Sequence, residues 1–179
     1  MKKVFTLATL MLAVVMTTSV SAQDFSGIDK SPMDMAAYPT DYKVSEKAVR
    51  IIYGRPQLKG RSMDELAPTG KVWRTGANEA PEITFYKDVN FGGKDIKAGT
   101  YSLFTIPGEE EWTVILNKNL NQWGSYFYDE SADVARVKVP NGSDSASLEE
   151  FSIAFKDAKG GTSLVMGWDK TRVAVPITM

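Results

Sequence analysis

The segment between residues 53 and 79 carries the densest group of side chains that could bind a ligand. Guanidinium groups pair well with carboxylates, sulfates and phosphates, and amides and carboxylates bind hydroxyl groups. Polar loops on rigid scaffolds are also where binding sites tend to lie. The sequence therefore predicts a site for an anionic or carbohydrate-like ligand. Its candidate residues in this segment are Arg55, Lys59, Arg61, Trp73, Arg74, Thr75, Asn78 and Glu79.

The same segment has a purely structural interpretation. A long loop must satisfy its own backbone groups, and arginine and asparagine side chains do this well. Arg74 and Glu79 could equally form an internal ion pair. Both interpretations stay open at the level of sequence.

A second candidate segment, NQWGSYFYDE at residues 121–130, is rich in aromatic side chains. Trp123 and Tyr126 could stack on sugar rings or peptide side chains if they are exposed, and would belong to the core if they are buried. We include both residues among the candidate ligand-binding residues and keep the alternative open.

The composition removes several catalytic mechanisms. The chain has no histidine and no cysteine, which excludes a Ser-His-Asp triad, a thiol nucleophile and an ordinary zinc site. No carboxylate spacing matches the twelve-residue calcium loop, so we expect no metal and no cofactor. The candidate catalytic residue is Glu79, acting as a base with Arg74 or Lys59 stabilising negative charge. A glycosidase would need a second carboxylate, and Asp129 is the one to test.

The first 22 residues have the pattern of a signal peptide. Lys2 and Lys3 precede an apolar run over residues 4–15, and residues 20–22 are Val-Ser-Ala. We expect cleavage after Ala22 and export to the periplasm or beyond, with no membrane span left in the mature chain. The net charge of −1 gives no support for nucleic-acid binding.

The rest of the chain is expected to be a single all-β domain. Residues 23–47 read as an extended N-terminal arm with one edge strand, and residues 48–179 as one antiparallel β-sandwich, jelly-roll-like in character. Short runs of alternating hydrophobicity separated by Gly and Pro support this interpretation. A single helical turn is predicted after Ser62, because Glu65 completes a capping box. Residues 141–147 are expected to form a loop.

Three stretches resemble one known family of exported bacterial proteins. They are RPQLKGRSMDELAPTGKVWRTGANEAPEITF, GTYSLFTIPGEEEWTVILNK and QWGSYFYD, and the resemblance to domain-of-unknown-function family 2911 extends over about residues 30–178. It implies a β-rich fold and export but no activity. Two positions depart from the family pattern: Pro81 replaces a usual threonine, and Thr69 replaces a common aromatic residue.

Three functions agree with these observations. The first is a binding module for a small molecule, a glycan or an envelope protein. The second is a histidine-independent hydrolase of envelope or glycan material, and the third is a structural or interaction protein of the envelope. The sequence does not fix the oligomeric state.

Overall fold

The computed structural model describes residues 25–179. The predicted signal peptide, residues 1–22, lies outside the described residues. The strands are β1 (Met33–Tyr38), β2 (Val49–Gly54), β3 (Glu82–Phe85), β4 (Val89–Phe91), β5 (Lys94–Ile96), β6 (Gly99–Ile106), β7 (Glu111–Asn117), β8 (Asp133–Pro140), β9 (Gly142–Ala158) and β10 (Gly161–Thr178). The helices are the single turn α1 (Met63–Leu66) and the 3-10 turn η1 (Glu130–Ala132). Within residues 25–179, neither helix is long and apolar enough to cross a membrane.

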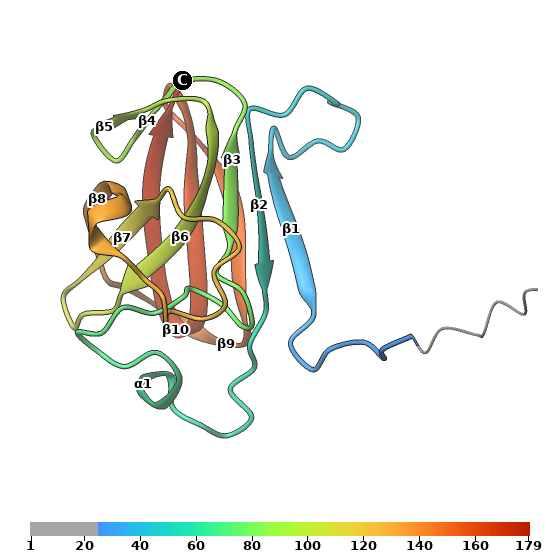
Figure 1. Cartoon of the computed structure of the whole chain (residues 1–179), viewed down its shortest axis with the longest axis vertical. Coiled ribbons are helices and arrows are strands. Elements are labelled where there is room, and N and C mark those ends of the chain that lie inside the picture. Colours follow the sequence, from blue (N-terminus) through green and yellow to red (C-terminus); the bar gives the residue numbers. More distant parts are fainter. Residues whose placement is uncertain (1–24) are drawn as a thin grey trace, which may run out of the picture.

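The strands form two antiparallel sheets, which confirms the predicted β-sandwich. The larger sheet has the order β1-β2-β3-β6-β7-β8, and the smaller one has the order β5-β4-β10-β9. Figure 1 shows β9 and β10 running behind β6, so the sheets make two layers. Buried side chains of both sheets form one continuous core between these layers.

Alternation along the strands decides which side chains enter this core. In β2, Val49 and Ile51 are fully buried, whereas Arg50 and Ile52, which alternate with them, are exposed. Successive side chains of a strand point to opposite faces, so one face of β2 packs inward and the other meets solvent. Burying such an aliphatic side chain contributes about 1.5–3 kcal/mol.

The N-terminal arm contributes the edge strand of the larger sheet. β1 pairs antiparallel with β2, with Met33 opposite Gly54 and Tyr38 opposite Val49. Figure 1 shows β1 at the outer border of the sheet, with β2 as its neighbour. The predicted edge strand is therefore present, and the boundary at residue 48 between arm and domain stays a prediction.

The smaller sheet differs from the sequence prediction at one place. Residues 142–147 were expected to be a loop, but they form the start of β9. Their partners lie far along the chain, with Gly142 opposite Arg172 and Ser143 opposite Thr171. The Arg172 side chain also donates a 2.6 Å hydrogen bond to the carbonyl of Ala146. Local composition carries no trace of these long-range partners, which is why the prediction was wrong.

β10 doubles back on itself near Asp169, where φ is +45°. A Cβ atom placed on Gly161 would overlap the carbonyl oxygen of Ile177, so the two ends of this long strand lie side by side. The Met179 amide also donates to the carbonyl of Gly160. Two runs of alternating hydrophobicity, at residues 162–169 and 172–178, therefore lie in the two halves of β10.

The predicted capping box is confirmed at the start of α1. The Ser62 side chain accepts a hydrogen bond from the Glu65 amide, and the Glu65 carboxylate accepts one from the Ser62 amide. These two bonds satisfy amides that the first helical turn would otherwise leave without partners. The helix consists of this one turn and lies in the loop between β2 and β3. The capping box therefore gives this loop a fixed local structure.

Candidate functional site

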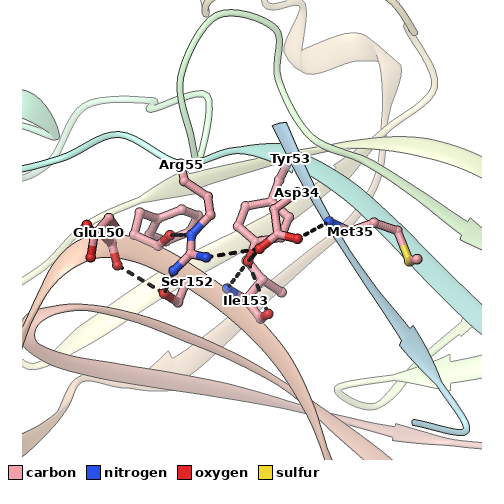
Figure 2. A network of polar contacts seen from close by, with 8 residues as sticks. Asp34, Met35, Tyr53, Arg55, Glu150, Ser152 and Ile153 are labelled. Atoms are coloured by element: carbon pink, nitrogen blue, oxygen red, sulfur yellow. Dashed lines mark hydrogen bonds and ion pairs between the residues drawn. The ribbon is translucent and has the colours of Figure 1, made fainter. Parts of the chain in front are cut away.

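Arg55 is engaged by three internal partners. Its Nε donates to the carbonyl of Phe151 at 3.1 Å, its Nη2 to Ser152 Oγ at 2.8 Å, and its Nη1 to Asp34 Oδ2 at 3.1 Å. Figure 2 shows this network joining β1, β2 and β9. The guanidinium therefore ties the edge strand to the second sheet and has its main donors already occupied.

The Arg61 side chain also braces the backbone of its loop, and the backbone of Lys59 is held there by Glu149. Arg61 donates from Nε to the carbonyl of Leu58 at 3.0 Å and from Nη2 to that of Gln57 at 2.9 Å. Lys59 has a φ of +49°, and its amide donates to the Glu149 carboxylate at 2.7 Å. The predicted cationic cradle is thus dispersed, because two of its guanidinium groups act as internal braces.

Replacing Arg55 by alanine is expected to lower the free energy of unfolding by about 1–2 kcal/mol, because Asp34 and the Phe151 carbonyl lose their partner. The side chains of the Arg55–Asp34 pair are about one third exposed or more, which keeps the loss moderate. Urea unfolding measures it. Arg50→Ala, at an exposed position of the same strand, is the control and should change stability by no more than about 0.5 kcal/mol. Equal losses in the two variants would contradict the bracing role.

Trp73 and Thr75 belong to the core, so neither is placed to contact a ligand. Trp73 is 5% exposed, and its ring stacks on Trp168 with 5.5 Å between centroids and 13° between planes. Thr75 is fully buried, and its hydroxyl contacts Thr105 Oγ1 at 3.1 Å. Because the loop approaches the core through these two side chains, this half of the Trp-Arg-Thr-Gly-Ala-Asn-Glu segment fixes the fold.

The backbone of this segment packs directly against the end of β2. A Cβ atom on Gly54 would overlap the carbonyl oxygen of Ala77, and one on Gly76 would lie 3.0 Å from the carbonyl oxygen of Gly54. Only glycine permits so close an approach of two backbones. Thr75 and Asn78 have φ values of +58° and +63°, so the chain turns sharply on both sides of this contact.

A cleft of about 380 Å³ lies at the end of β2, between the segment that leads into β1 and the loop that leads into β3. Its largely apolar lining is formed by Met33, Ile52, Tyr53, Gly54, Ala77 and Ala80. Its polar lining is formed by Asp29, Ser31, Asn78, Glu79, Glu82 and Asn121. The structure therefore brings two of the predicted site residues, Asn78 and Glu79, into one concave surface.

The cleft is rich in hydrogen-bond acceptors. Among residues 25–179, its lining includes three carboxylates and two side-chain amides but no lysine or arginine. Glu82 Oε1 already accepts a 2.9 Å hydrogen bond from the Asn121 amide, which joins the start of β3 to the segment that carries Trp123. Within residues 25–179 no group of three or more histidine, cysteine, aspartate or glutamate side chains is placed to hold a metal ion. This lining suits an uncharged or cationic ligand that donates hydrogen bonds.

Trp123 lies beside the cleft because its segment pairs with the segment that carries Glu79. The two residues face each other across an antiparallel bridge, flanked by bonds from the Ala80 amide to the Gln122 carbonyl at 2.8 Å and from the Gly124 amide to the Asn78 carbonyl at 2.9 Å. Directly opposite residues of an antiparallel pair place their side chains on one face. Trp123 is 56% exposed, so a broad aromatic surface adjoins the cleft.

Tyr126 is also at the surface, with 79% of its area exposed. Its ring packs near Gly124, where an added Cβ would lie 2.8 Å from two ring carbons. Of the two interpretations of the aromatic segment, exposure therefore holds for Trp123 and Tyr126. Tyr128 instead packs on Phe104, with 5.0 Å between ring centroids.

Several cleft residues were not among the predicted site residues. Asp29 and Ser31 come from the N-terminal arm, and Glu82 and Asn121 come from strand and loop positions without a motif. Only the pairing of β1 with β2 brings the arm to this place. The polar residues before β1 were the one feature of the sequence that could have indicated this part of the cleft. They resemble the polar residues of any solvated segment, so they do not identify a site.

A second hollow, of about 410 Å³, lies beside the hairpin of β4 and β5. Its polar side chains mostly satisfy one another. Lys97 Nζ contacts Asp88 Oδ2 at 2.7 Å, and Asn90 Nδ2 donates to Asp95 Oδ1 at 2.8 Å. Since those groups are paired, this hollow is a weaker candidate than the cleft at the end of β2.

The comparisons with curated proteins and with solved structures found no match. A family model does match, over residues 31–177, which include every cleft residue except Asp29, the buried half of the Trp-Arg-Thr-Gly-Ala-Asn-Glu segment and nearly all strand residues. The chain therefore belongs to the family DUF2911, proteins of unknown function.

Proposed function

We propose that the protein is a binding module whose cleft at the end of β2 holds a carbohydrate-like, hydroxyl-rich ligand. The observation that carries this proposal is the meeting of Asn78, Glu79 and Glu82 over an apolar floor, with Trp123 exposed alongside. Sugars offer hydroxyl donors at their edges and apolar C–H faces, so they fit a site that combines acceptors with an aromatic surface.

The geometry supports a hydroxyl-rich ligand for the cleft more than an anionic one. Arg55 and Arg61 direct their donors to internal acceptors, and no cationic side chain of the described part of the chain lines the cleft. An anion in the cleft would meet carboxylates from Asp29, Glu79 and Glu82, which repel it. Hydroxyl groups can donate to those same oxygens.

The hydrolase alternative has one supporting observation, because Glu82 lines the same cleft as Glu79. Two carboxylates on either side of a glycosidic bond are what most glycosidases require. The earlier candidate partner, Asp129, caps η1 instead, and its Oδ1 accepts bonds from the amide and hydroxyl of Ser131. Product release from a bound oligosaccharide would favour hydrolysis over simple binding.

Isothermal titration calorimetry with a panel of neutral oligosaccharides tests the proposal. We expect binding by the wild type and at least about tenfold weaker binding by Glu79→Gln, because a charged acceptor becomes a neutral amide with a single acceptor oxygen. Glu109→Gln, at an exposed position in the turn before β7, is the matched control and should bind like the wild type. The proposal fails if no oligosaccharide binds, or if Glu79→Gln binds each of them as tightly as the wild type.

Export is part of the same proposal, and it is supported by the signal-peptide pattern of the first 22 residues. Expression of the full chain in a bacterium with a periplasm should yield a mature protein that begins at Gln23. Mass spectrometry of the intact protein measures this. Retention of residues 1–22, or recovery in the cytoplasm alone, would contradict export.

A further inference from the structure

Arg74 is a half-buried arginine for which the structure provides no internal partner. Its Nε is buried and makes no hydrogen bond, and no salt bridge within residues 25–179 involves its guanidinium. The predicted Arg74–Glu79 ion pair is therefore not formed. The other half-buried arginines are all engaged: Arg55, Arg136 and Arg172 each contact a carboxylate.

The guanidinium of Arg74 lies next to the exposed aromatic segment. The position of a Cβ on Gly124 is 3.8 Å from Arg74 Nη1 and 2.8 Å from two ring carbons of Tyr126. Gly124 in turn donates to the carbonyl of Asn78, a residue that lines the cleft. Arg74 Nη1 thus lies near Gly124, which follows Trp123 in the chain and is bonded to a cleft residue.

Protein atoms cover Nε, whereas Nη1 and Nη2 of Arg74 are not buried and make no hydrogen bond within residues 25–179, so a ligand can reach these two groups. A guanidinium offers a planar fork that matches a carboxylate, with two parallel hydrogen bonds. An adjoining aromatic ring is suited to the apolar face of a sugar that carries such a group. The chemistry of this place differs from that of the cleft, where carboxylates predominate.

Building on the proposed function, we propose that Arg74 binds the carboxylate of an acidic sugar, so that the ligand is a glycan containing uronic acid residues. A neutral sugar residue occupies the cleft, and the acidic residue next to it extends over the Trp123 segment to Arg74. The carboxylates of Glu79 and Glu82 exclude the acidic residue from the cleft, and Arg74 attracts it outside. The negative charge of the cleft and the positive charge of Arg74 together fix the orientation of the bound glycan.

The experiment compares an oligosaccharide that contains uronic acid with its carboxyl-reduced form, which has the same linkages but no charge. Isothermal titration calorimetry of the wild type should show at least about tenfold tighter binding of the acidic form. Arg74→Gln should remove this preference and leave binding of the reduced form unchanged. Arg74→Lys should retain part of it, because a point charge remains without the fork. Arg50→Gln is the control for loss of one exposed positive charge, and it should keep the full preference.

Each outcome decides a different claim. Equal binding of the two forms by the wild type would overturn the inference about uronic acid while the binding of oligosaccharides stands, and this comparison does not depend on any variant folding. Retained preference in a folded Arg74→Gln protein, checked by its thermal melting, would assign Arg74 a purely internal role and also overturn the inference. Absence of binding to either form would instead count against the proposed function itself.

Discussion

Replacing Trp73 by alanine should lower the free energy of unfolding by about 3–5 kcal/mol, the range measured for removal of large buried aromatic side chains. The indole stacks on Trp168 and meets the edges of Trp112 and Phe151, with ring centroids 6.3 Å and 5.2 Å away. The surrounding rings cannot collapse into the space it leaves, because they are held by strands of both sheets. Equilibrium unfolding in urea measures the change.

Trp123→Ala is the matched control for this prediction. It removes the same side chain from a position that is 56% exposed, so its effect on stability should stay within about 0.5 kcal/mol. We expect its effect on ligand binding to be the larger one. Similar stability losses at both positions would contradict the assignment of Trp73 to the core and Trp123 to the site.

Replacing Gly54 by alanine should cost about 1–3 kcal/mol of stability, the usual range for overpacking. The added Cβ would meet the backbone carbonyl of Ala77, which cannot rotate away as a side chain would. Both residues line the cleft, so the loop that carries Asn78 and Glu79 must shift, and oligosaccharide binding should weaken as well. Thermal melting and calorimetry of one preparation measure both effects.

Gly27→Ala provides the comparison, because no atom that the structure describes, apart from its chain neighbours, lies within 4 Å of its added Cβ. This variant should melt and bind like the wild type. A Gly54→Ala protein with unaltered stability and binding would show that the loop tolerates displacement. It would contradict the claim that the close contact between Gly54 and the Ala77 carbonyl requires glycine.

The sequence predicted the fold well because its signals are local. The alternation of Val49 and Ile51 with Arg50 is visible within one strand, and the capping box joins Ser62 to Glu65 within one helical turn. Such patterns depend on side-chain direction over a few residues and need no knowledge of distant partners.

The site was only partly predictable, because its architecture depends on contacts between distant segments. From the sequence, Arg55 was a plausible ligand-binding residue. In the folded chain it donates hydrogen bonds to Phe151 and Ser152, which lie almost a hundred positions further along the chain. Asp29 has no distinguishing feature in the sequence. It lines the cleft because β1 pairs with β2 and so places the N-terminal arm there. Glu79 was identified from its motif, and its role as a lining residue was visible only in the folded chain.

The most direct test of the central claim is a nuclear magnetic resonance titration of the ¹⁵N-labelled protein with a bound oligosaccharide. The chain has four tryptophans, and three of them are in the core. We predict that the indole signal of Trp123 and the side-chain amide signals of Asn78 and Asn121 move, whereas the indole signals of the three buried tryptophans stay in place. If only signals of the hairpin of β4 and β5 moved and the signals of the cleft residues stayed in place, the claim that the cleft binds the ligand would be contradicted.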